Sequence, residues 1–105
     1  FLEASEKIKQ RVVAARQKQQ VRFTDETIHS NSQMKNSHLK KYCKLSPEVE
    51  QILTQAAAKF QLSARSYMKM IKVARTIADL ANTKEIETPH MLEALQYKPK
   101  SYESA

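Results

Sequence analysis

The chain has 105 residues, of which 41% are hydrophobic, enough for one modest core but not for an elaborate catalytic cleft. It contains no glycine, which excludes the glycine-rich phosphate loops of P-loop and dinucleotide-binding domains. Its 18 Lys and Arg against 11 Asp and Glu give a net charge of +7, which favours contact with phosphates of nucleic acid or nucleotide.

A basic amphipathic helix is predicted for residues 4 to about 22. Apolar residues recur there at the spacing of a helix and form a thin stripe: Ala4, Ile8, Val12 and Ala15. The residues around the stripe are largely basic: Lys7, Lys9, Arg11, Arg16, Lys18 and Arg22. We therefore expect a helix with one narrow packing face and a positively charged surface.

The segment 24–36 is predicted to be a flexible loop. Residues 24–34, "TDETIHSNSQM", lose the helical period and collect Ser, Asn, Thr and Asp. Ser37 is then expected to cap a short helix that places Leu39, Tyr42 and Cys43 on one side. Lysines, among them Lys40 and Lys41, would lie on its other side.

Three further helices are predicted in the second half. Ser46 as N-cap and Pro47 at the first helical position open one helix, and Ser63 opens a second that runs to about residue 81. Thr88 followed by Pro89 repeats the pattern of an N-cap residue and a proline and opens the third helix. Residues 99–105 are expected to be a frayed tail. With no strand period of useful length, we predict an all-α fold, a small bundle of four to five helices in a single domain over 1–105.

Arg65 lies in the first turn of the helix that Ser63 opens. A helix N-terminus already concentrates positive potential, so an exposed cation there is unfavourable by about 0.3–1 kcal/mol unless an anion meets it. Two explanations remain open. Arg65 pairs with a nearby carboxylate such as Glu48 or Glu50 or stays in solvent, or an anion is delivered from outside the chain.

The segment "LSARSYMKMIKVARTIADL", followed by "IETPHMLEALQYKP", resembles the C-terminal domain of the magnesium-chelatase-related AAA+ ATPases, the bacterial ComM/YifB group. The earlier segments "IKQRVVAARQKQQVRF" and "LKKYCKLSPE" follow the order of the same family. The resemblance covers nearly the whole chain and is densest over 62–99. It implies a helical lid after an ATP-binding core, in which Arg65 would be the sensor-2 arginine on the γ-phosphate side of ATP.

The resemblance also implies partners. ATP and Mg²⁺ would be bound mainly by an upstream domain of the parent protein, so that the fragment alone is no enzyme while the parent is an ATPase. The parent would be a homo-hexameric ring in the bacterial cytoplasm that acts in DNA processing, with its own AAA+ core and DNA as partners. Arg11 and Arg16 match recurring family positions and would contact nucleotide or a neighbouring subunit, or else form a solvated basic face.

A second hypothesis is a freestanding basic helical module that binds nucleic acid directly. Lys7, Lys9, Lys40 and Lys41 would then contact the phosphate backbone, with an affinity that depends on salt but hardly on sequence. Few aromatic residues are interleaved with these lysines, so stacking on single strands is poorly supported and binding would be weak.

Other chemistry finds little support. Cys43 has no partner for an internal disulfide, and neither it nor the three histidines show metal-ligand spacing, so we expect a reducing, cytosolic context and no metal site. No apolar run approaches the ~18 residues of a membrane span, so we expect no membrane contact. The absence of an initiator methionine and of a signal peptide suggests a fragment of a longer protein. Arg75 is expected to pair with Asp79 four residues later.

Overall fold

The computed structural model describes residues 2–98, and the side chains of residues 5–98. This part of the chain forms five α-helices, one short 3-10 helix and no strand, which confirms the predicted all-α bundle. The elements are α1 (Leu2–Arg22), η1 (Asn31–Gln33), α2 (Asn36–Tyr42), α3 (Pro47–Phe60), α4 (Ala64–Leu80) and α5 (Thr88–Leu95).

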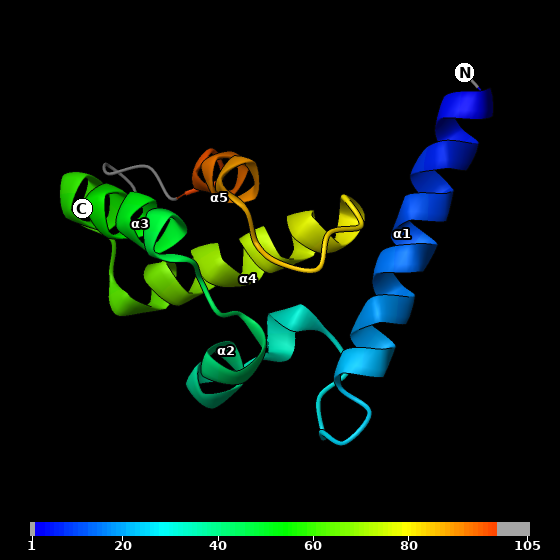
Figure 1. Cartoon of the computed structure of the whole chain (residues 1–105), viewed down its shortest axis with the longest axis horizontal. Helices are drawn as coiled ribbons and strands as arrows, with labels where there is room; N and C mark the ends of the chain where they lie inside the picture. The colour runs from blue at the N-terminus through cyan, green and yellow to red at the C-terminus, as the bar shows by residue number, and fades with distance from the viewer. Residues whose placement is uncertain (1, 99–105) are drawn as a thin grey trace.

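Helix α4 lies at the centre of the arrangement. It packs against α5, α1, η1 and α2, while α3 packs against α5 (Figure 1). The core between these helices contains side chains with almost no exposed surface: Leu53, Met70, Ala74, Ala78, Met91 and Ala94. Every other helix is thus positioned by α4, or by α5 on top of it.

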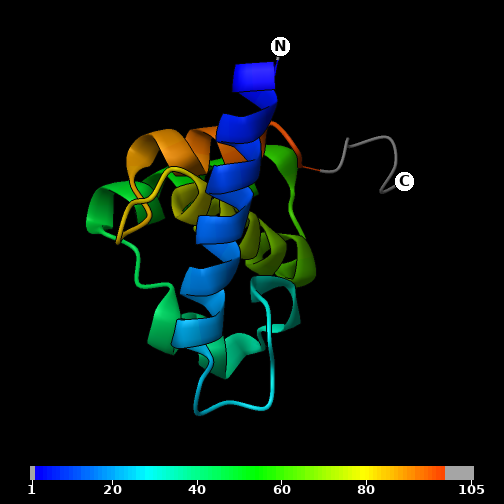
Figure 2. The same cartoon turned by 90° about the vertical axis from the view of Figure 1, so that its right-hand side faces the viewer.

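Helix α1 crosses the bundle and projects beyond it with its first turns (Figure 2). Of the predicted apolar stripe, Ala15 is buried, but Ile8 is 52% exposed because the helix has left the bundle at that point. Ala4 belongs to the residues whose side chains are not described. The predicted narrow packing face is therefore used only in the second half of the helix.

The predicted starts of α3 and α4 are confirmed. The hydroxyl oxygen of Ser46 accepts the backbone N–H of Val49 at 3.3 Å, and Pro47 is the first helical residue. Ser63 likewise accepts the N–H of Ser66 at 3.1 Å. Each serine thus accepts a hydrogen bond from one of the backbone N–H groups that a helix N-terminus leaves without a partner.

The predicted starts of α2 and α5 are wrong by one or two residues. Lys35 rather than Ser37 is the N-cap of α2, and Glu87 rather than Thr88 is the N-cap of α5. In each case a histidine three residues further on accepts the backbone N–H of the N-cap residue through Nδ1, at 2.9 Å for both His38 and His90. The imidazole thus accepts the N–H group that the side chain of Glu or Gln accepts in a capping box.

The segment predicted as a flexible loop, 24–36, contains more structure than its composition indicates. It includes η1, and three of its side chains, Ile28, Asn31 and Met34, are buried. Ile28 and Met34 pack in the core together with Phe23. Its flexibility stays a prediction, and so does the frayed tail over 99–105, which lies outside the described residues.

Two helices end in the left-handed conformation without glycine. Gln61 (φ 53°) follows α3, and Asn82 (φ 59°) follows α4 by two residues. Glycine is the usual residue at such positions because it has no Cβ to clash, and Asn tolerates the conformation better than most others. These two turns show how a chain without glycine reverses direction between helices.

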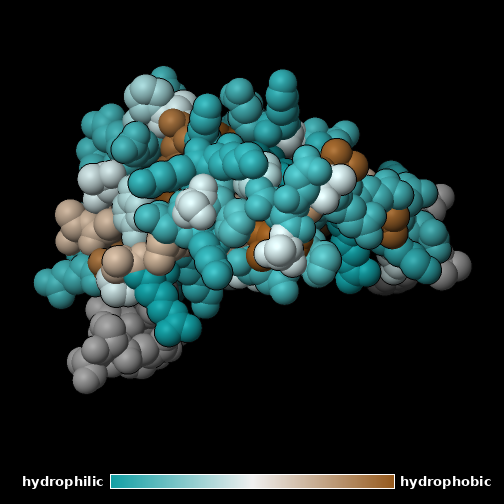
Figure 3. Space-filling view, turned by 90° about the horizontal axis from the view of Figure 1, so that it is seen from below, coloured by the Kyte–Doolittle hydropathy of each residue, from teal (hydrophilic) through white to brown (hydrophobic). Residues whose placement is uncertain are grey.

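The face of the molecule that is seen from below is mainly hydrophilic (Figure 3). Figure 3 views the molecule from below and shows hydrophobic side chains only in small, separate spots on that face. None of the described helices combines the length and the apolar character needed to cross a bilayer.

Candidate functional site

Arg65 is exposed in the first turn of α4, where the sequence places it. None of the ion pairs among the described residues includes Arg65, so the proposed pairing with Glu48 or Glu50 does not form. The cation at this helix start therefore has no carboxylate partner in the described part of the chain.

A groove of about 470 Å³, here called the α4 groove, runs along the exposed face of α4 from Arg65. It is lined by Ser32, Arg65, Met68, Lys69, Lys72, Val73, Thr76 and Ile77. Its three cations are four and three residues apart, which places them on one side of the helix. The apolar side chains of Met68, Val73 and Ile77 are half-buried and lie beside these cations.

No carboxylate lines the α4 groove. The only acidic residue of α4 is Asp79, which is 1% exposed and belongs to the interior. Lys72 donates from Nζ to the backbone carbonyl of Ser32 at 3.4 Å, a contact with a neutral group that leaves its charge uncompensated. Three positive charges on one helix face produce a potential that attracts anions.

A buried cluster of polar side chains, here called the Asp79 cluster, lies next to the groove. Its members are Arg22, Asn31, Arg75, Thr76 and Asp79. Arg22 donates to both carboxylate oxygens of Asp79, from Nη1 at 2.9 Å and from Nη2 at 2.7 Å. Arg75 contacts the same carboxylate from Nη2 at 3.1 Å, which confirms the predicted pair.

Asn31 joins three elements within this cluster. Its amide nitrogen donates to Asp79 at 2.9 Å and to the hydroxyl of Thr76 at 3.1 Å, and its amide oxygen accepts from Arg22 at 2.8 Å. Its backbone N–H donates to the side chain of Gln19 at 2.9 Å. Since Thr76 also lines the α4 groove, Asn31 connects the wall of the groove to α1.

The environment of Asp79 favours its charged form. Burial alone would raise its pKa, but the hydrogen bonds from Arg22 and Asn31 and the charges of Arg22 and Arg75 outweigh burial, so its pKa is lowered from the usual value. Arg75 also donates to the backbone carbonyls of Thr83 and Lys84, at 3.1 and 3.0 Å, while its buried Nε has no partner among the described residues. Two guanidinium groups thus share one carboxylate.

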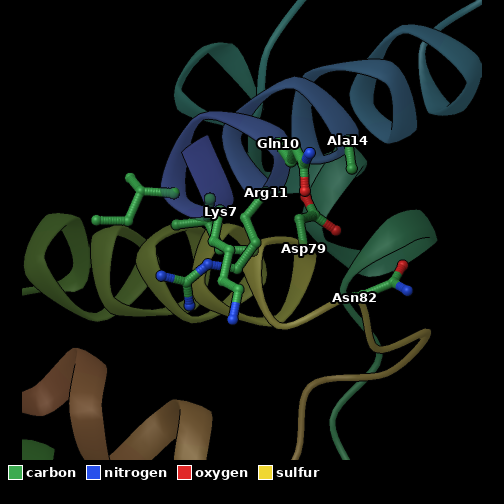
Figure 4. A pocket seen from close by; sticks show the side chains of 8 residues that line it. Lys7, Gln10, Arg11, Ala14, Asp79 and Asn82 are labelled. Atoms are coloured by element: carbon green, nitrogen blue, oxygen red, sulfur yellow. The ribbon is translucent and has the colours of Figure 1, made fainter. Parts of the chain in front are cut away.

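A second cavity, of about 620 Å³ and here called the α1 pocket, lies between α1 and the C-terminal end of α4 (Figure 4). It is lined by Lys7, Ile8, Gln10, Arg11, Ala14, Asp79, Leu80 and Asn82. Lys7 and Arg11 extend side by side from α1 across α4. Larger than the α4 groove, this pocket contains only two cations and does not include Arg65.

The structure separates the other predicted arginines. Arg11 lines the α1 pocket, whereas Arg16 is exposed about 140° further around the helix, given 3.6 residues per turn. Neither lines the α4 groove with Arg65. Within this chain, Arg11, Arg16 and Arg65 therefore do not line one common pocket.

The four lysines of the nucleic-acid hypothesis do not form one surface. Lys7 and Lys9 lie on the projecting half of α1, at the opposite end of the molecule from α2, which contains Lys40 and Lys41 (Figures 1 and 2). Lys41 also donates to Glu26 at 3.2 Å, so part of its charge is neutralised locally.

The residues that sequence reasoning missed fall into two kinds. Lys69 and Lys72 received no role from the sequence, although their spacing from Arg65 and the lack of an acid between them indicate an anion-binding face. Asn31 and Arg22 gave no usable signal, because one lies in a polar loop and the other among many basic residues.

No three His, Cys, Asp or Glu side chains of the described residues lie close enough to hold a metal ion. Cys43 is buried against Met34, and burial raises the pKa of its thiol to about 11. A thiol in this state is a poor nucleophile.

The chain was compared with known proteins. A family described as magnesium chelatase, subunit ChlI C-terminal, matches residues 2–98. Competence protein ComM of Haemophilus influenzae is 34% identical over 96 residues, or 91% of this chain. The uncharacterized proteins YifB of Escherichia coli and Salmonella typhimurium are 34% and 32% identical over the same length. This chain spans 18% of the length of each of these relatives.

Proposed function

This chain belongs to the magnesium chelatase subunit ChlI C-terminal family, and from that premise we propose that it is the helical lid of an AAA+ ATPase in which Arg65 contacts bound ATP. The match over residues 2–98 confirms the resemblance noted in the sequence. Because the chain spans 18% of its relatives, ATP hydrolysis is a property that we propose for the full-length protein.

The observation that supports this function is the unpaired Arg65 at the start of α4. Ser63 occupies only the N–H of Ser66, so the N–H groups of Ala64 and Arg65 have no hydrogen-bond partner among the described residues. A guanidinium group and free N–H groups at one helix end are a favourable site for phosphate oxygens. Charge on the transferring phosphoryl group would be stabilised by the same groups.

The rest of the ATP site would come from elsewhere in the protein. The chain has no glycine for a phosphate-binding loop, and the described residues do not provide a set of Mg²⁺ ligands. We propose that an upstream AAA+ core holds ATP and Mg²⁺. In this proposal the parent is a cytoplasmic homo-hexameric ring that acts on DNA, and the lid moves relative to the core during ATP turnover.

The test is Arg65→Ala in the full-length protein. Loss of one group that stabilises charge in the transition state should lower ATP turnover on the order of 10²-fold, as removal of an oxyanion-hole donor does. Lys59→Ala, which removes an exposed cation from α3, serves as the control and should leave turnover unchanged. Equal turnover of the Arg65 variant and the parent protein would disprove the role of Arg65.

A further inference from the structure

We propose that the whole α4 groove binds a triphosphate, with Lys69 and Lys72 as phosphate ligands in addition to Arg65. This inference rests on the proposed function and extends it from a single arginine to a groove with three cations. It assigns a ligand class, the linear polyphosphate of a nucleotide, to two lysines whose side chains have no carboxylate partner among the described residues.

The spacing of the cations suits a short phosphate chain. At a rise of about 1.5 Å per residue, Arg65, Lys69 and Lys72 are distributed over roughly 10 Å of α4. After Lys72 the groove continues with Thr76 and Ile77, which carry no charge. The charged part of the groove is thus short, as a triphosphate requires, and its long side chains are able to converge on one ligand.

The position of Lys72 is fixed by neutral groups. Its Nζ donates to the carbonyl oxygen of Ser32, and its own backbone carbonyl accepts from the hydroxyl of Thr76 at 3.1 Å. Thr76 in turn accepts from the buried amide of Asn31. The only hydrogen bond of the ammonium group among the described residues is thus with a neutral carbonyl at the edge of the groove, which leaves its positive charge available to an anion.

The apolar side of the groove provides a second, independent argument. Met68, Val73 and Ile77 are half-buried beside the cations and offer an apolar surface to the sugar or base of a nucleotide. The volume of about 470 Å³ is within the common range for small-molecule sites, roughly 300–1,000 Å³. No aromatic side chain lines the groove, so the base stacking by which proteins bind single strands is not provided.

The first experiment measures binding of inorganic tripolyphosphate to the 105-residue chain at low salt by calorimetry. Lys69→Ala and Lys72→Ala should each weaken binding on the order of tenfold to 100-fold, as expected for one lost charged hydrogen bond. Lys59→Ala, the matched control, should change binding less than twofold. If the control weakens binding as much as the groove variants do, attraction is only non-specific and the proposal is wrong.

A second experiment tests whether the groove binds the phosphates of a nucleotide or those of a nucleic-acid strand. ATP should bind the chain more tightly than a six-nucleotide single strand at the same salt concentration, because the three phosphates of ATP are contiguous, whereas sugars separate the phosphates of a strand and keep them from meeting all three cations at once. Tighter binding of the strand, lost in the Lys69 and Lys72 variants, would assign the groove to a nucleic-acid backbone and overturn the nucleotide assignment.

The full-length protein separates this inference from the proposed function. Lys69→Ala and Lys72→Ala should raise the KM for ATP with little change in kcat, whereas Arg65→Ala should lower kcat. If only the Arg65 variant is impaired, the role of Arg65 stands and the three-cation groove is disproved. If the lysine variants raise KM while Arg65→Ala leaves kcat unchanged, the groove stands and the catalytic role of Arg65 is disproved.

Discussion

The α4 groove and the Asp79 cluster lie next to each other along the same helix and have Thr76 in common, but only the cluster neutralises its cations with a carboxylate. In the groove, Arg65, Lys69 and Lys72 face solvent with no carboxylate among the lining residues. In the cluster, Arg22 and Arg75 bind one buried carboxylate through several hydrogen bonds. The basic residues of the cluster therefore stabilise the fold, whereas those of the groove are the cations that we propose to bind a ligand.

The largest effect should come from removing the carboxylate that organises the cluster. Asp79→Ala leaves Arg22 and Arg75 without a counter-charge in the interior, and breaking a buried pair from one side costs about 3–5 kcal/mol. We expect a loss of that size in the free energy of unfolding, measured with urea. A loss below about 1 kcal/mol, the range of a surface pair, would show that the cluster and the groove do not differ in this way.

The second effect concerns the side chain that joins η1 to α1 and α4. Asn31→Ala removes one acceptor and two donors and leaves their buried partners unsatisfied, which costs about 1–3 kcal/mol. Relative to the parent chain, exchange of backbone amide hydrogens should accelerate more in the second half of α1 than in α3 and α5, because α1 loses the hydrogen bond from Arg22 to Asn31, one of the contacts that join it to η1 and α4. Uniform acceleration in all helices would contradict a local role.

The third effect is a dependence of stability on pH. The pKa of Asp79 is lower in the folded than in the unfolded chain, so its contribution is complete above the unfolded value of about 3.8–3.9 and decreases as the pH falls through the lower folded value. Urea unfolding between pH 7 and pH 2 should show this loss in the parent chain. Asp79→Asn should be less stable at pH 7 and should lack that part of the acid-dependent loss.

The smallest expected effect is an increase, rather than a decrease, in the free energy of unfolding. Like charges four residues apart on a helix destabilise it by about 0.2–0.5 kcal/mol, so Lys69→Ala should stabilise the ligand-free chain by a few tenths of a kcal/mol. Differential scanning calorimetry of this variant and of the parent chain makes the comparison. A Lys69 variant that is less stable than the parent chain would mean that this groove cation contributes to the fold after all.

The sequence was sufficient for the parts of the fold that local chemistry determines. Ser46 with Pro47, and Ser63, marked the beginnings of α3 and α4 because a serine hydroxyl binds a backbone N–H within three residues. The starts of α2 and α5 were missed because a histidine, rather than Glu or Gln, binds the N-cap N–H. That substitution is not part of the usual sequence signal for a helix start.

The candidate site was predictable only in part. The position of Arg65 followed from the cap at Ser63, and the contact of Arg75 with Asp79 followed from their separation of four residues. The other partners of Asp79 are Arg22, 57 residues away, and Asn31, 48 residues away. Periodicity within one helix contains no information about such contacts, and the same polar composition that indicated a loop concealed a buried asparagine.

The shared carboxylate of the Asp79 cluster also constrains how this family can evolve. A lineage that lost Asp79 alone would leave Arg22 and Arg75 facing each other without an anion between them. We expect the surviving lineages to have changed at least one of these arginines together with Asp79, and Asn31 with them. Substitutions at the end of α1 and near the end of α4 should then be inherited as correlated sets, even though 57 residues separate Arg22 from Asp79 in the chain.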